Sequence, residues 1–125
     1  MSGALGNYIV DSKIVTDPTN NITYTGILYK NRLLRISCYK DNIPYDQPSV
    51  TSVTFDFTSK LGTRFEFLST AVYTIKHVAD FVLNFSQRSS NVKNITSTSL
   101  TYFYNSSSDP ARYAVNVLLT GIATI

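Results

Sequence analysis

The order of apolar and polar positions along this chain predicts a fold built mainly from antiparallel β-strands. Residues 7–16 ("NYIVDSKIVT") read as a first strand that ends at the turn signal "DPTNN". Residues 22–40 read as two further strands. A two-residue turn at 30–31 would pair Thr23 with Cys38 and leave both faces of this hairpin partly apolar.

Four phenylalanines that alternate with polar residues give the clearest hairpin signal: Phe55, Phe57, Phe65 and Phe67. A three-residue loop ending at Gly62, with the glycine in the left-handed conformation, would pair Phe55 with Phe67 and Phe57 with Phe65. We therefore predict a hairpin over residues 49–69 with the four rings on one buried face.

The apolar period changes after this predicted hairpin. Apolar residues recur at helical spacing at Val72, Ile75, Ala79 and Val82. A polar group falls on the opposite side: Lys76, His77, Asp80 and Asn84. This spacing predicts one helix over about residues 70–85. A further strand is expected at "LTYFYN", residues 100–105.

The last fourteen residues, "RYAVNVLLTGIATI", carry no charge after Arg112. Read as a strand, residues 113–125 have one continuous apolar face, from Tyr113 to Ile125, and one mildly polar face. We expect the first face in the core, the second partly covered, and a bend at Gly121. The residues after the bend would pack on the domain or on a neighbouring molecule.

Composition agrees with strands and with one domain over residues 1–125. Charged residues make up 15% of the chain, against about 25% in average proteins, and Glu66 is the only glutamate. Threonine and tyrosine, which suit strands, are abundant. The predicted fold is an antiparallel β-sandwich or barrel built from hairpins, with the one helix above. Cys38 is the only cysteine, and neither a secretory signal nor a membrane-length apolar run is present, so we expect a protein made in the cytoplasm and no membrane contact.

Residues that could carry chemistry are sparse, and we predict no enzyme, no cofactor and no metal site. His77 is the only histidine and is expected on the surface, while Cys38 is expected as an inert buried thiol. The predicted hairpin places Asp56 opposite Glu66, about 5 Å apart. That spacing suits a glycosidase pair, but an outward strand face offers no cleft, so a solvated face is the favoured interpretation.

A basic and aromatic group in "YKNRLLRISCYK" is the candidate nucleic-acid surface: Lys30, Arg32, Arg35 and Tyr39. Aromatic rings beside cations hold single strands in several β-barrel folds. The favoured interpretation is a strand edge protected by charge, so nucleic acid is not the expected partner. Nine tyrosines without tryptophan leave a sugar-binding surface open.

Together these features are typical of a structural subunit that assembles with copies of itself and with other structural proteins. We expect a small virion component, such as a phage capsid decoration, neck, tail or baseplate protein. Its expected interface residues are Tyr113, Leu118, Ile122 and Ile125. The alternative is a monomeric β-sandwich or barrel module that binds carbohydrate or single-stranded nucleic acid.

Overall fold

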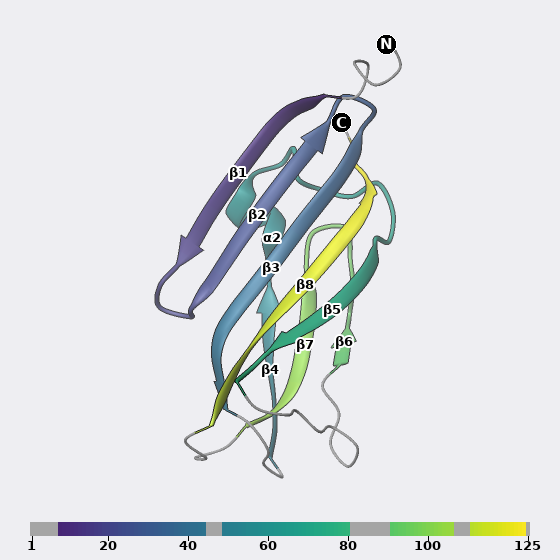
Figure 1. Ribbon diagram of the computed structural model, residues 1–125. Coiled ribbons are helices and arrows are strands. Elements are labelled where there is room, and N and C mark those ends of the chain that lie inside the picture. Colours follow the sequence, from purple (N-terminus) through teal and green to yellow (C-terminus); the bar gives the residue numbers. More distant parts are fainter. Residues whose placement is uncertain (1–7, 45–48, 81–90, 107–110, 125) are drawn as a thin grey trace.

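The computed structural model describes residues 8–44, 49–80, 91–106 and 111–124 as two antiparallel sheets, one in front of the other (Figure 1). The larger sheet has the order β1 (Ile9–Asp17), β2 (Ile22–Tyr29), β3 (Leu33–Pro44), β8 (Arg112–Ile122) and β5 (Val72–Val78). The smaller sheet has the order β4 (Ser49–Phe55), β7 (Leu100–Ser106) and β6 (Asn91–Lys93). A short helix, α2 (Phe57–Leu61), follows β4. The prediction of a mainly β, antiparallel fold is confirmed.

The core lies between the two sheets. Alternate residues of β2, β3 and β8 face inward and are buried: Ile22, Tyr24, Leu28, Leu34, Ile36, Cys38, Val115, Val117 and Leu119. The smaller sheet contributes Phe55, Leu100 and Tyr102 from the opposite side. The rings of Tyr24 and Phe55 meet edge to face across the gap, with centroids 6.3 Å apart. This alternation of buried and more exposed residues accompanies the three strands that the sequence predicted at these positions.

The hairpin of β2 and β3 exists, but its predicted register is wrong by one residue. Tyr24, not Thr23, pairs with Cys38. The loop has three residues, 30–32, because Arg32 adopts a positive φ of 72° that closes the turn. A shift of one residue exchanges the faces of one strand relative to the other, which brings Tyr24 and Leu28 of β2 onto the same inner face as Leu34, Ile36 and Cys38 of β3.

The predicted hairpin over residues 49–69 is wrong. β4 ends at Phe55, α2 begins at Phe57, and β4 pairs with β7 along its whole length. The four phenylalanines are nevertheless buried, as expected. Phe65 and Phe67 reach the core from the segment 62–71, which crosses the inner face of the larger sheet.

Two glycines of the larger sheet make room for these two rings. A Cβ at Gly26 would lie 2.5 Å from Cδ1 of Phe65, and a Cβ at Gly121 would lie 2.8 Å from Cδ1 of Phe67. Any side chain at either position would occupy the space of the ring. Phe67 also forms a bridge with Ala123 and packs edge to face on Phe57.

The predicted helix over residues 70–85 is also wrong, because residues 72–78 form β5. Residues 81–85 lie outside the described residues. β5 is an edge strand with exposed residues on both faces, so its sequence does not have to alternate. Without alternation, its β-branched residues fell at helical spacing by coincidence.

The terminal strand has the two predicted faces. Its inner residues are buried from Tyr113 to Leu119, and its outer residues after Ala114 are half-buried or exposed. β8 continues through Gly121 to Ile122, between β3 and β5. Ala123 is buried, and its N–H donates to the carbonyl of Arg32 at 2.9 Å. The residues beyond the glycine therefore pack on the domain itself, and Ile125 lies outside the described residues.

Candidate interaction surface

The outer face of the five-stranded sheet is the candidate functional site. We define it as the side chains of β1, β2, β3, β8 and β5 that point away from the smaller sheet. Figure 1 looks onto this face: the five strands lie in front, and β4, β6, β7 and α2 lie behind them. No described element covers it in that view. A sheet face of this size is normally packed against something or is strongly polar.

The outer face is mostly apolar or hydroxyl-bearing. Its apolar members come from all five strands: Ile9, Ile14, Ile27, Tyr29, Leu33, Tyr39, Val72, Val78, Ala114, Leu118 and Ile122. Ile14 and Val72 are each 73% exposed, and Ile122 is 45% exposed. Neighbouring apolar side chains on an exposed face, such as Leu33 opposite Ile122, are of the kind that marks contact surfaces.

Leu118 occupies an interior position of the outer face. It lies on β8, the interior strand between β3 and β5, opposite Ser37 on one side and Thr74 on the other. Nearby, the Ser37 hydroxyl donates to Oδ1 of Asn116 at 2.6 Å, which fixes both polar side chains within the sheet surface. This position is thus a half-buried leucine within a ring of small polar groups, a layout that resembles the centre of a protein interface.

The charge on the outer face is sparse and mostly positive. Its strand positions carry Arg35, Lys76 and Arg112, and one carboxylate, Asp41, lies beside the bulge of β3 at one end of the face. The acids of β1 point the other way. Asp11 accepts from Arg64 at 3.2 Å, and Asp17 lies 3.9 Å from Lys60. Little charge would have to lose its water if this face were covered.

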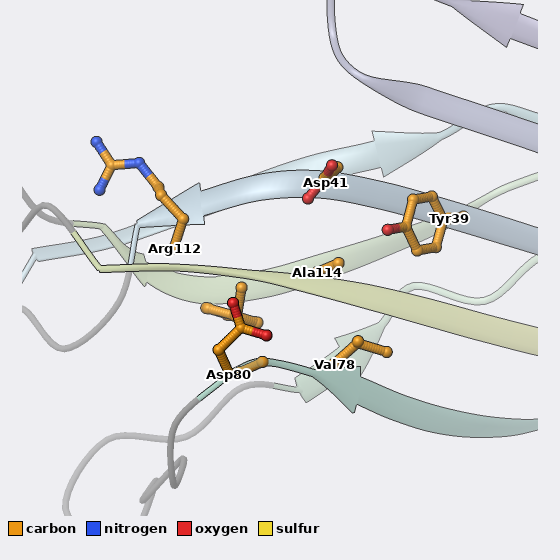
Figure 2. Close-up of a pocket in the computed structure, with 8 residues that line it drawn as sticks. Tyr39, Asp41, Val78, Asp80, Arg112 and Ala114 are labelled. Atoms are coloured by element: carbon orange, nitrogen blue, oxygen red, sulfur yellow. The ribbon is translucent and has the colours of Figure 1, made fainter.

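A shallow hollow of about 190 Å³ lies at the end of the outer face, where β3, β8 and β5 meet. Figure 2 shows Asp41 and Asp80 on either side of β8, with Ala114 between them and the Arg112 side chain directed away. Tyr39, Val78, Ala79 and Tyr113 complete the lining. Two carboxylates on a shallow rim favour a contact with a basic group over a site for bond chemistry, which needs exclusion of water.

The predicted interface residues are divided by the structure. Leu118 and Ile122 lie on the outer face. Tyr113 lies inside, 3% exposed, and its hydroxyl is 3.0 Å from that of Tyr102 in the smaller sheet. Ile125 lies outside the described residues. The sequence pattern identified the right strand but did not separate its two faces for this purpose.

The basic and aromatic group does not form one cluster. Arg35 and Tyr39 lie on the outer face, whereas Lys30 and Arg32 lie in the turn between β2 and β3. Arg32 is engaged within the domain, where its guanidinium donates to the carbonyl of Ala123 at 2.7 Å. The Lys30 ammonium lies over the ring of Tyr8, 5.3 Å from the centroid.

His77 lies on the inner side of β5 and is half-buried, not on the surface as predicted. Its Nε2 is 3.1 Å from the hydroxyl of Tyr102, which continues to Tyr113. This chain of three side chains joins the two sheets. Burial lowers the pKa of His77, because it disfavours the charged imidazolium. The arrangement suits a structural link between sheets.

The other two candidates for chemistry were the Asp56–Glu66 pair and the Cys38 thiol. Asp56 precedes α2, and Glu66 lies in the segment after that helix, so the predicted opposed pair does not exist. Cys38 is fully buried on the inner face of β3, and burial raises the pKa of its thiol, which keeps it protonated. Among the described residues, no group of three or more histidines, cysteines or acids lies close enough to hold a metal ion.

The sequence analysis missed the two edges of the larger sheet. Six of the nine large apolar side chains exposed among the described residues belong to its edge strands: Ile9, Val10, Ile14, Val72, Tyr73 and Val78. The signal was present as apolar residues on both parities of β1 and β5. It could not be interpreted without knowing that these strands are edges.

No helix in the described part of the chain is long and apolar enough to cross a membrane. Comparison with protein-family models, with curated proteins and with solved structures finds no match to this chain. Its function is therefore argued from the surface described above.

Proposed function

We propose that this chain is a non-enzymatic structural subunit that assembles with copies of itself through the outer face of the five-stranded sheet. The observation that carries the proposal is the composition of that face: exposed isoleucine and valine on its edges, Leu118 on the interior strand β8, and sparse charge that is mostly positive. Such a face gains free energy on burial, at roughly 25 cal/mol per Å² of apolar surface removed from water.

The wider setting proposed for this subunit is a virion. The protein would be made in the cytoplasm and incorporated into a particle as a small capsid decoration, neck, tail or baseplate component. Low charge, abundant threonine and an arrangement of two antiparallel sheets support this setting by general character. Other structural proteins of the same particle would be its further partners.

The central test places a charge in the interior of the outer face. We expect Leu118→Glu to reduce self-association, measured as solution mass by light scattering over a range of concentrations, because the carboxylate would lose its water in the interface. Leu68→Glu is the matched control, since Leu68 is 60% exposed but lies outside every strand. Ile122→Glu repeats the test at a more exposed position of the same face.

Circular dichroism of each variant separates loss of association from loss of folding. Folded Leu118→Glu and Ile122→Glu proteins that associate as strongly as the Leu68→Glu control would overturn the proposal. The alternative proposal is a monomeric module for carbohydrate or single-stranded nucleic acid. One result would support this alternative: a folded monomer that binds single-stranded DNA. The affinity would have to fall steeply with salt concentration and depend on Arg35 and Tyr39.

A further inference from the structure

The two edges of the five-stranded sheet differ in how they are protected. β1 carries three charged residues among its nine and a bulge near Val10. Charge and bulges are the usual means by which proteins prevent an edge strand from pairing with another chain. β5 carries one charged residue, Lys76, among its seven and pairs with β8 without a bulge. Within the described part of the chain, β5 is thus the edge open to pairing.

β5 also exposes apolar side chains on both of its faces. Val72 and Val78 are 73% and 48% exposed on the outer face, and Tyr73 is 37% exposed on the inner face. β8 lies on one side of β5, and no strand among the described residues lies on the other. An extended backbone of this kind can accept another strand as an extension of the sheet.

We propose that β5 pairs antiparallel with β5 of a second copy about a two-fold axis, joining two five-stranded sheets into one. This inference rests on the proposed assembly function and specifies its first contact. A two-fold axis requires each pair to be reciprocal, and the pleat requires outer residues to lie opposite outer residues. Only registers centred on a residue meet both conditions.

The register centred on Ile75 is the best of these. It pairs all seven residues, with Val72 opposite the partner's Val78, and Thr74 opposite the partner's Lys76. Both outer apolar residues then meet apolar residues, and no like charges are opposed. A register centred on Lys76 would place two lysines opposite each other, and one centred on Thr74 would place Val72 opposite the partner's Lys76. Charge and apolar matching therefore select one register.

The pairing would make the outer faces of the two copies continuous, because β5 contributes the outward residues Val72, Thr74, Lys76 and Val78 to that face. Two faces that are each incomplete at the β5 edge would become one surface spanning ten strands. The isologous contact closes on itself, so the rest of the outer face remains for further contacts.

The test uses the full chain and changes the charge at one exposed position. Thr74→Lys would oppose a lysine to the partner's Lys76 twice, once on each side of the axis. We expect the dissociation constant of the dimer to rise about tenfold or more at low salt, measured by sedimentation equilibrium. Thr74→Lys with Lys76→Glu restores opposite charges across the axis, and should return the constant to within about threefold of the parent.

Thr16→Lys is the matched control, because Thr16 is an exposed, outward threonine on the other edge strand, β1. It should leave the dissociation constant unchanged. If the parent associates but Thr74→Lys behaves like Thr16→Lys, or the double variant fails to recover, the β5 pairing is wrong while assembly stands. If the parent is monomeric at every concentration, the proposed function fails as well.

Discussion

Gly26→Ala tests the packing of Phe65 against β2, the contact that most distinguishes this fold from the predicted hairpin. The added Cβ would lie 2.5 Å and 2.8 Å from two carbons of the Phe65 ring and 3.0 Å from Cδ1 of Leu61. Ordinary contacts begin near 3.4 Å, so the ring would have to withdraw by about 1 Å. Phe65 is 1% exposed, so the ring has no free space into which to move.

The expected cost is set by two opposing effects. Overpacking a tight core costs about 1–3 kcal/mol, while replacing glycine by alanine stabilises by about 0.4–1 kcal/mol through the unfolded chain. We therefore expect a net loss of about 1–2 kcal/mol in the free energy of unfolding. Urea titration followed by far-ultraviolet circular dichroism measures it. Thr25→Ala, on the outer side of the same strand, should change stability by less than about 0.5 kcal/mol.

A second substitution identifies the cause of the loss. Phe65→Leu removes the ring edge that the new methyl would strike, so its cost and that of Gly26→Ala should not add. Contacting residues usually couple by about 0.5–3 kcal/mol, and here the double variant should be more stable than the sum of the two changes predicts. A Gly26→Ala protein as stable as its parent, or fully additive costs, would refute the packing argument.

Two further predictions concern the link between sheets and the chain end. Burial lowers the pKa of His77 below its ordinary 6.5, so the unfolded chain takes up the proton first as the pH falls. The folded protein should therefore lose stability below about pH 6.5. His77→Gln should reduce that loss, measured by thermal melts at about pH 5 to 8. A variant with the same pH profile as the parent would exclude His77 as the cause. Deleting residues 122–125 removes five hydrogen bonds, including those from Arg32 to Ala123 and Thr124, and should lower the free energy of unfolding by about 3 kcal/mol or more, measured by urea titration. An unchanged midpoint would show that these contacts contribute little.

Local alternation predicted the strands whose two faces differ in environment. β1 and its turn, and β7, follow the sequence pattern, and β8 has the predicted buried and half-buried faces. The candidate site was predicted only in part, through Leu118 and Ile122. The rest depends on facts that no local pattern contains. Phe55 belongs to a strand whose partner, β7, lies about 45 residues further along the chain, so its alternation pointed to the wrong neighbour.

The prediction of a helix in place of β5 was wrong for a related reason. A strand with one buried and one exposed face must alternate, but an edge strand whose inner face is only half-buried does not have to. Whether residues 72–78 form such an edge depends on β8, whose sequence lies about 40 residues away. For the same reason the sequence could not identify β5 as a contact surface. Its apolar residues are visible in the sequence, but the strands that lie beside it are not.

The position of β8 between β3 and β5 has a consequence for the rate at which the protein folds. β8 joins the β1–β2–β3 meander to β5, yet Leu33 pairs with Ile122 and Pro44 with Arg112, roughly 70–90 residues apart in the chain. Pairings of such high contact order form slowly, because the loop-closure entropy is lost before the contacts reward it. Until β8 docks, the edge of β3 that later pairs with β8 has no partner strand, and the apolar side chains of Ile36 and Cys38 lie beside it. We expect this intermediate to be the aggregation-prone species during refolding, so yield should fall as the refolding concentration rises.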